Sequence, residues 1–81
     1  MPLAMEEKLF TLLSDYAKVP REKISVHSRM QSFAEDSLAI TELSFKLRKA
    51  FEVPIADEDL DPLETVGELI ELVDTRLASW P

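Results

Sequence analysis

Apolar residues recur every three or four positions in three stretches of the chain, a spacing that places them on one face of an α-helix. The first stretch predicts a helix over residues 3–18, with its polar positions on the opposite side. This helix should end before Val19-Pro20, because the residue that precedes a proline disfavours helical backbone. The apolar face predicted for it consists of Met5, Leu9, Leu12, Leu13, Tyr16 and Ala17, with Phe10 at its margin.

The second stretch predicts a helix over residues 37–51 that carries apolar side chains on two sides. Leu38 and Phe45 project roughly 180° away from the core-facing stripe of this helix. Two interpretations fit the pair: either a neighbouring segment covers it, or it is an exposed docking surface surrounded by charge. Periodicity alone does not decide between them. The core-facing stripe consists of Ile40, Leu43, Leu47, Ala50 and Phe51.

The third stretch predicts a helix over residues 65–78, where Thr65 and Glu68 have the spacing of a capping box. Just before it, residues 57–60 predict one short helical turn begun by Asp57. The apolar face of the last helix consists of Val66, Leu69, Ile70, Val73 and Leu77, widened by Leu72.

Residues 20–36 form a connection longer than is usual between packed helices, and loops of this length are commonly functional. Its only histidine, His27, has no companion ligands at a spacing typical of a metal site, so we expect a solvated loop histidine and no metal. Four apolar residues are expected to anchor the connection to the core: Ile24, Val26, Met30 and Phe33.

Together these elements predict an all-α fold: an antiparallel helical bundle of three main helices and one short helix, with a long loop between the first two. No segment alternates convincingly as a strand. The length of 81 residues predicts a single domain over residues 1–81. The initiating Met1 and the short tails favour a free-standing protein over an excised domain.

Composition excludes several classes of partner and site. Sixteen acidic against nine basic residues give a net charge of −7, which argues against nucleic acid because phosphate binding needs a basic surface. The absence of cysteine excludes disulfides and Cys-based zinc sites, and the single glycine argues against a phosphate-cradling loop. No signal peptide or membrane-spanning segment is evident. We therefore expect a cytoplasmic monomer that binds neither nucleic acid nor membrane.

Asp36 and Ser37 stand where the long loop meets the second predicted helix. The Asp36 carboxylate is in position to cap this helix by accepting backbone N–H groups of its first turn. Ser37 then lies at the helix N-terminus, where unpaired N–H groups and the helix dipole favour a phosphate. This position suits a hydroxyl that carries a phosphodiester. Asp-Ser is also an ordinary helix start, and these two residues alone favour plain capping.

Ser37 is not expected to act as a catalytic nucleophile. A nucleophilic serine needs a general base within hydrogen-bond reach, and His27 lies ten residues earlier in a loop. The chain also lacks a Gly-x-Ser-x-Gly elbow. We therefore predict no catalytic residue and no enzymatic activity, and a functional Ser37 would be a site that another enzyme modifies.

The chain resembles the acyl carrier proteins and the related polyketide and peptidyl carrier domains over nearly its whole length. Asp36-Ser37-Leu38, after a long loop and at the start of an amphipathic helix in a short acidic chain, carries most of this resemblance. The supporting features are Ile24 in the loop, Leu43, Leu47 and Phe51 on the second helix, Val53-Pro54-Ile55, the short acidic third helix, and Thr65-Val66.

The resemblance implies that a separate phosphopantetheinyl transferase, working with a divalent metal, attaches 4′-phosphopantetheine from coenzyme A to Ser37, positioned by Asp36. Acyl intermediates would travel as thioesters on the thiol of that arm. The implied partners also include a ketosynthase, an acyltransferase or acyl-activating enzymes. The run Ser-Leu-Ala-Ile-Thr-Glu-Leu at residues 37–43 favours polyketide or other secondary-metabolite biosynthesis over fatty-acid biosynthesis. The expected partner-docking residues on the second helix are Leu38, Thr41, Glu42, Phe45, Arg48 and Lys49.

Two features depart from the family's pattern. Ala34 stands where the family usually has glycine, and a left-handed backbone there would cost alanine about 1 kcal/mol or more. The docking helix of the family is typically strongly acidic. The corresponding helix here has only Glu42 as an acidic residue, and Lys46, Arg48 and Lys49 make its C-terminal half basic. Part of this positive charge is explained because cations favour a helix C-terminus. The rest of the positive charge suggests dedicated partners rather than a generic fatty-acid synthase.

Two other functions are compatible with the same residues. In a helical interaction module without a covalent cofactor, Leu38 and Phe45 would bind a partner and Ser37 would belong to the cap. In a peptidyl carrier protein, Ser37 would bear the same arm with an aminoacyl cargo.

Overall fold

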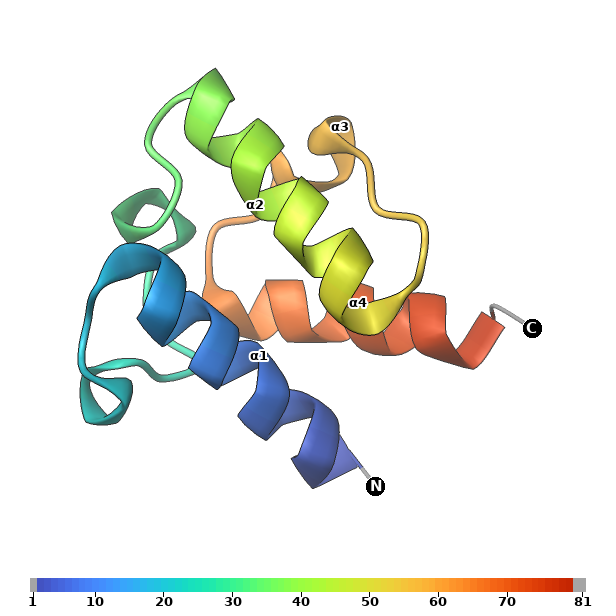
Figure 1. The fold of residues 1–81 in the computed structure, drawn as a ribbon, viewed down its shortest axis with the longest axis horizontal. Helices are drawn as coiled ribbons and strands as arrows, with labels where there is room; N and C mark the ends of the chain where they lie inside the picture. Colours follow the sequence, from blue (N-terminus) through green and yellow to red (C-terminus); the bar gives the residue numbers. More distant parts are fainter. Residues whose placement is uncertain (1, 80–81) are drawn as a thin grey trace.

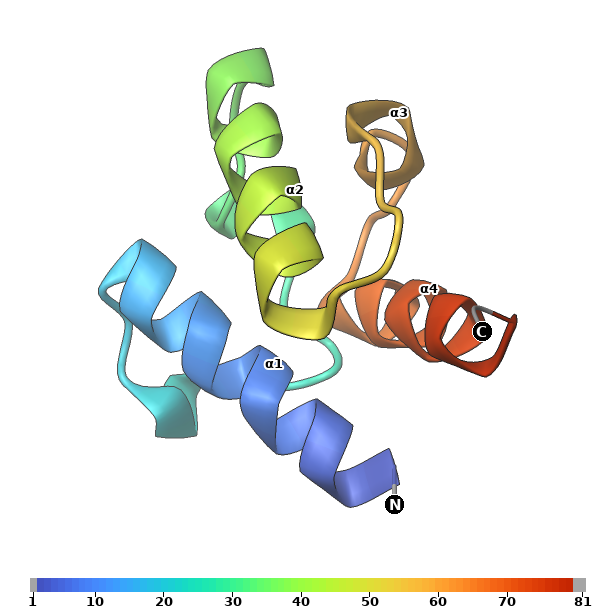
Figure 2. The same ribbon diagram turned by 45° about the vertical axis from the view of Figure 1, so that its right-hand side comes forward.

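The computed structural model describes residues 2–79, and Trp80 lies outside this range. Its helices are α1 (Pro2–Ala17), α2 (Ser37–Phe51), α3 (Asp57–Leu60) and α4 (Val66–Ser79). α1 runs opposite to α2 and α4, and the short α3 lies beside α2 (Figures 1 and 2). The predicted all-α bundle is therefore confirmed. The long first loop contains two 3₁₀ turns that the sequence did not predict, η1 (Arg21–Lys23) and η2 (Met30–Ser32).

The ends of α2 and α3 are those predicted, and the ends of α1 and α4 differ from the prediction by one residue. α1 ends before Lys18, which adopts left-handed backbone with a φ of 61°. The N–H of Val19 then reaches back to the carbonyl of Ser14 at 3.2 Å, a bond that closes the helix end. α4 begins one residue after Thr65, whose hydroxyl accepts the N–H of Glu68 at 3.4 Å.

The reciprocal half of the predicted capping box is displaced by one residue. The Glu68 carboxylate accepts the N–H of Glu64 at 2.7 Å, not that of Thr65. Both bonds still satisfy backbone donors at the start of α4.

The core collects the predicted apolar faces of α1, α2 and α4 around Leu9, Leu13, Leu43, Leu47 and Val73, all with no exposed surface. Ile24, Met30 and Phe33 anchor the loop in this core as predicted. Ile40, Ala50 and Leu72 are only half-buried at its edge.

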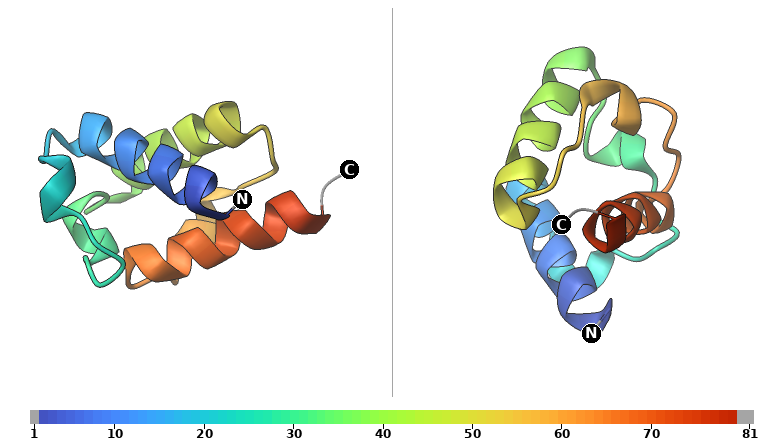
Figure 3. Two further views of the ribbon diagram at one scale, coloured as in Figure 1. Left: turned by 90° about the horizontal axis from the view of Figure 1, so that it is seen from below. Right: turned by 90° about the vertical axis from the view of Figure 1, so that its right-hand side faces the viewer.

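Three apolar positions differ from the sequence prediction, and one buried polar position was not predicted. Phe10 is buried rather than marginal, because the Arg21 guanidinium covers its ring at 4.3 Å from the centroid. Leu77 is exposed because the last turn of α4 extends past the other helices (Figure 3). Val26 is exposed, since its backbone rather than its side chain holds the loop in place. Ser44, which no apolar pattern could reveal, is completely buried.

The first loop is attached to the start of α4 through backbone hydrogen bonds. The N–H of Met30 donates to the carbonyl of Glu64, and the N–H of Val66 donates to the carbonyl of Ser28, both at 2.9 Å. Gly67, the single glycine, donates to the carbonyl of Val26, and a Cβ at this glycine would lie only 3.2 Å from that oxygen. These contacts fix the loop that leads into α2.

Replacing Glu52 with glycine is expected to stabilise the protein by about 0.5 to 1 kcal/mol. Glu52 ends α2 in left-handed backbone, with a φ of 57° and its N–H bonded to the Arg48 carbonyl at 2.8 Å. Glycine adopts this conformation without the Cβ penalty. Urea unfolding measures the gain, and Glu52→Ala, which removes the same charge but keeps the Cβ, should show none. An equal gain in both variants would assign the effect to charge.

Candidate functional site

The start of α2 has the geometry predicted for a capped helix. Asp36 has extended backbone (φ −131°, ψ 178°), and its carboxylate accepts the N–H of Ala39 at 2.9 Å. Its carbonyl accepts the N–H of Ile40 at 3.0 Å. Ser37 follows as the first residue of a helix of 15 residues, with its side chain exposed. The predicted cap is confirmed, and it leaves the Ser37 hydroxyl open to solvent.

This terminus can accommodate a phosphate on Ser37. The first N–H groups of a helix have no intrahelical partner, and the helix dipole adds partial positive charge at the same end. Ala34 does not add strain to the approach, because the non-glycine residues of the described chain with positive φ are Lys18 and Glu52. The cost considered for a left-handed Ala34 therefore does not arise, and its N–H bonds to the carbonyl of Met30 at 2.9 Å.

Tyr16 of α1 stabilises the first turn of α2. The sequence predicted only that Tyr16 packs in the core. Its hydroxyl donates to the carbonyl of Ala39 at 3.0 Å. Burial, followed by the nearby carboxylates of Glu42 and Asp36, raises the pKa of Tyr16 above its ordinary value. The phenol therefore remains protonated and able to donate.

One hollow is lined by Ser37 itself and a second adjoins it, and the half-buried Ile40 borders both. The smaller, of about 250 Å³, lies between α2 and α3 and is lined by Ser37, Ile40, Thr41 and the carboxylates of Asp57, Glu58 and Asp61. The larger, of about 320 Å³, extends from there toward the first loop and Leu63. The three acidic residues that line the smaller hollow disfavour a phosphate inside it, whereas the helix terminus favours an anion.

α3 is fixed to α2 through one carboxylate. Asp57 accepts the hydroxyls of Thr41 and Ser44, each at 2.6 Å. The helical turn predicted to begin at Asp57 is confirmed, since α3 spans Asp57–Leu60. Ala56 occupies the cap position before it, and the Asp59 carboxylate accepts the N–H of Ala56 at 2.9 Å. The Asp57 side chain turns toward the buried Ser44, a partner that only the folded chain reveals.

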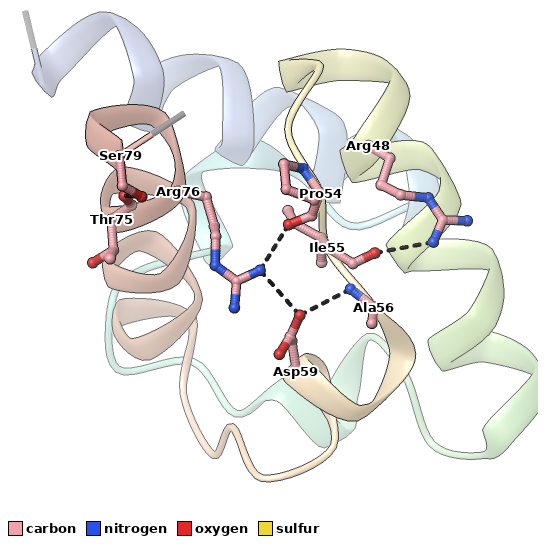
Figure 4. A network of polar contacts seen from close by, with 8 residues as sticks. All are labelled: Arg48, Pro54, Ile55, Ala56, Asp59, Thr75, Arg76 and Ser79. Atoms are coloured by element: carbon pink, nitrogen blue, oxygen red, sulfur yellow. Dashed lines mark hydrogen bonds and ion pairs between the residues drawn. The ribbon is translucent and has the colours of Figure 1, made fainter. Parts of the chain in front are cut away.

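Two arginines, one from each neighbouring helix, hold the segment that leads into α3 (Figure 4). Arg48 of α2 donates to the carbonyl of Ile55 at 3.0 Å. Arg76 of α4 donates to the carbonyl of Pro54 at 2.7 Å and to the Asp59 carboxylate at 3.1 Å. The wall of the hollow beside Ser37 is therefore set by contacts to both α2 and α4.

The outer face of α2 contains all the predicted docking residues. Leu38 and Phe45 are 69% and 54% exposed, so the interpretation that a neighbouring segment covers them is wrong. Glu42 and Lys49 are exposed with them, and the Lys49 ammonium lies 5.5 Å from the Phe45 ring centroid. Thr41 and Arg48 are also exposed, but their polar groups bind the α3 region as described above.

Stability should fall in acid because two carboxyls near α3 have lowered pKa values. The hydroxyls of Ser44 and Thr41 lower the pKa of Asp57 below its ordinary value of 3.8. For Asp59, the N–H of Ala56 and then Arg76 lower the pKa. A lowered folded-state pKa gives stabilisation that is present above the unfolded-state value and is lost as the pH falls through the folded-state value.

The expected result is an unfolding midpoint in urea that is level above about pH 5 and declines below about pH 4. Asp57→Asn should flatten this decline. The matched control is Glu58→Gln, which removes the same charge from an exposed neighbour on α3 and should leave the decline unchanged. Equal curves for both variants would contradict the assignment to Asp57.

Among residues 2–79, no group of three or more potential ligands comes together in a way that could hold a metal ion, and His27 is exposed in the loop. None of the helices in this range is both long and apolar enough to cross a membrane.

Comparison with known proteins bears on the capped, exposed serine. A profile of the family described as "Phosphopantetheine attachment site" matches residues 7–73, most of the chain. An acyl carrier protein of Clostridium perfringens is 33% identical over 70 residues, which cover 85% of this chain and 92% of the relative. The chain belongs to the acyl carrier protein family. The family resemblance of the sequence is thereby confirmed, and 4′-phosphopantetheine is the cofactor of this carrier protein.

Two further relatives show the range of proteins to which this chain is similar in sequence. An acyl carrier protein of Syntrophus aciditrophicus is 27% identical over 79 residues, 96% of this chain and 99% of the relative. A hydroxamate-type ferrichrome siderophore peptide synthetase of Schizosaccharomyces pombe is 31% identical over 71 residues. Those residues are 88% of this carrier protein but only 1% of the synthetase.

Proposed function

We propose that this carrier protein receives 4′-phosphopantetheine on Ser37 and carries acyl intermediates as thioesters on the thiol of that arm. The observation that carries the proposal is the exposed Ser37 hydroxyl at the first position of α2, beside the Asp36 cap. The family match supplies the cofactor, and the exposed Ser37 hydroxyl lies at a helix terminus that is favourable to phosphate.

The residues around Ser37 have separate roles in this proposal. The Ser37 oxygen bonds to the phosphorus of the phosphopantetheine half of coenzyme A, adenosine bisphosphate leaves, and the transferase takes the serine proton. Asp36 and Tyr16 hold the first turn of α2 in place while this happens. The proposal assigns no catalytic base to this chain and gives the reactions on the cargo to its partners.

The exposed face of α2 is the proposed docking surface for those partners, which are the phosphopantetheinyl transferase and a ketosynthase, acyltransferase or acyl-activating enzyme. Leu38 and Phe45 provide apolar contacts, and Glu42 and Lys49 provide charged ones. Thr41 and Arg48 take part mainly by fixing α3, since their polar groups are bonded within the chain. Apolar anchors with charged surroundings are typical of protein interfaces.

The cargo proposed is an acyl group of polyketide or other secondary-metabolite biosynthesis, favoured by the run at residues 37–43. The second candidate is a peptidyl carrier function, which the similarity to a siderophore peptide synthetase favours. Offering the modified protein separately to an acyltransferase with acyl-coenzyme A and to an amino-acid-activating enzyme distinguishes the two. The thioester formed is identified by the mass of the intact protein.

The test of the attachment is incubation with coenzyme A, magnesium and a phosphopantetheinyl transferase of broad specificity. The intact protein should gain the mass of one phosphopantetheine group, and fragmentation should place that mass on Ser37. No gain in mass, or a gain on another residue, would overturn the proposal and favour a helical interaction module without the cofactor.

A further inference from the structure

A groove runs between α1 and α2, on a different side of α2 from the hollows beside α3. Its volume is about 480 Å³, and its lining includes three large apolar or aromatic side chains: Leu12 and Tyr16 of α1 and Phe45 of α2. Leu12 and Tyr16 are half-buried, whereas Phe45 is exposed. The other lining residues are Asp15, Lys46, Lys49 and Ala50.

Positive charge collects at one end of this groove although the whole chain has a net charge of −7. Lys46 and Lys49 line it, and Lys8 of α1 lies further along, 5.2 Å from the ring centroid of Phe51 at the end of α2. The helix dipole accounts for basic residues in the last turn of α2, which contains Lys49 but not Lys46. An acidic protein with two lysines over an apolar groove offers a local complement to carboxylates.

The end of the groove nearer Ser37 has the opposite charge. Asp15 lines it there beside Tyr16, and the carboxylate of Glu42 acts on the same tyrosine. The groove therefore changes from acidic to basic along its length. Such an arrangement favours one orientation of a bound segment, because the reverse orientation would place like charges together.

We propose that this groove is a docking site for an amphipathic segment of a partner enzyme, with apolar side chains on Leu12, Tyr16 and Phe45 and carboxylates against Lys46 and Lys49. The site adjoins the exposed line of Leu38 and Phe45 on α2 and extends it onto α1. Phe45 lies eight residues after Ser37, roughly 12 Å along the helix axis, so a segment held here leaves the serine accessible.

Charge selects this occupant over two others. A second copy of the chain would bring another net charge of −7 toward the first, which opposes association. An acyl chain carries no group that uses the lysines that line the groove. The inference rests on the proposed function only for the expectation that the partner is an enzyme that acts on a carrier protein.

The test uses the unmodified protein, labelled with ¹⁵N, and two synthetic amphipathic helical peptides as probes. The peptides share the same leucine positions and differ only in having glutamate or lysine at the flanking positions. The glutamate peptide should bind about fivefold more tightly or better, and its amide shifts should centre on Leu12, Tyr16, Phe45 and Lys49. Lys46→Glu combined with Lys49→Glu should abolish that preference.

The matched control combines Lys18→Glu with Lys23→Glu, which makes the same change in net charge at two exposed lysines elsewhere. It should retain at least half of the preference. Equal binding of the two peptides, equal loss in both double variants, or shifts centred on the α2–α3 hollow would overturn the proposal. Concentration-dependent dimer formation, or the same shifts produced by an acyl-loaded arm without peptide, would assign the groove to another occupant.

The peptide result is independent of the attachment test, since both peptides are titrated into the unmodified protein. A protein that gains phosphopantetheine on Ser37 but shows no peptide preference would retain the carrier function and lose only the groove. A protein that shows the peptide preference but gains no phosphopantetheine on Ser37 would retain the groove as a docking site and rule out the carrier function.

Discussion

Replacing Leu47 with alanine is expected to lower the free energy of unfolding by about 3 kcal/mol, whereas Leu38→Ala should change it by less than about 0.5 kcal/mol. Both leucines lie on α2, nine residues apart. Leu47 has no exposed surface and lies in the core, while Leu38 is 69% exposed. The two substitutions make the same change in intrinsic helix propensity, so their difference isolates the contribution of burial.

Urea unfolding followed by circular dichroism measures both variants. A loss of about 3 kcal/mol is a large part of the stability of a small domain, so Leu47→Ala should be partly unfolded at moderate urea concentrations that leave Leu38→Ala folded. Similar losses in the two variants would show that Leu38 is covered in solution. That result would contradict its place on the docking surface.

These two leucines also show which features the sequence predicts well. The side of α2 that enters the core follows from residues spaced three or four apart, because packing satisfies the same periodicity that the helix imposes. The Asp36 cap follows from a side chain that bonds to a backbone group three residues away. Both depend on neighbours in the sequence, and both are confirmed.

The exposure of Leu38 and Phe45 could not be predicted in the same way. Whether an apolar pair is covered depends on where a distant segment lies, and α3 packs beside a different part of α2. Sequence periodicity indicates that a helix has a second apolar side, but it does not indicate whether another segment covers that side.

The contacts that hold α3 were missed for a related reason. The sequence places Asp57 at the start of a helical turn, but it does not show that the fold brings this carboxylate next to Ser44, thirteen residues away, and to Thr41. Arg76 meets Pro54 and Asp59 from the far end of the chain. A polar side chain can bond to many partners, so its identity alone does not select one before the tertiary structure is known.

Gly67 shows that a long-range backbone contact can require a particular residue for reasons that the sequence does not reveal. In the sequence, a lone glycine inside a predicted helix costs stability relative to alanine. In the structure it allows the carbonyl of Val26 to approach within hydrogen-bond distance of its N–H. The reason for the residue is thus a long-range backbone contact, which attaches the first loop to α4.

Ser37→Ala is expected to abolish the gain of phosphopantetheine while leaving the free energy of unfolding within about 0.5 kcal/mol of the unsubstituted protein. The Ser37 side chain is exposed, so its hydroxyl adds little to the fold, and the cap is supplied by the neighbouring Asp36. Intact mass after incubation with the transferase measures modification, and urea unfolding measures stability. Exposed Ser32, in the loop just before this site, provides the matched control: Ser32→Ala should be modified in full.

Asp36 should affect the rate of this modification rather than its possibility. Asp36→Ala removes the acceptor of the Ala39 N–H and costs about 1 kcal/mol of cap stability, so the turn that presents Ser37 is formed less often. The initial rate of transfer should then fall by up to about tenfold. Asp36→Asn keeps an equally good cap without the negative charge, and its rate should stay close to that of the unsubstituted protein.

The Asn and Ala variants separate two ways in which Asp36 can serve Ser37. If the cap alone matters, the transfer rates follow the stability of the first turn of α2, which amide exchange at Ala39 and Ile40 reports directly. A different result would contradict the capping explanation: the transfer rate falls equally in both variants, although Asp36→Asn keeps its amide protection at Ala39 and Ile40. The transferase would then recognise the carboxylate itself. Because the Asp36 carboxylate already accepts the Ala39 N–H at 2.9 Å and acts on Tyr16, we expect the first outcome, in which Asp36 works by holding the helix start beneath the serine.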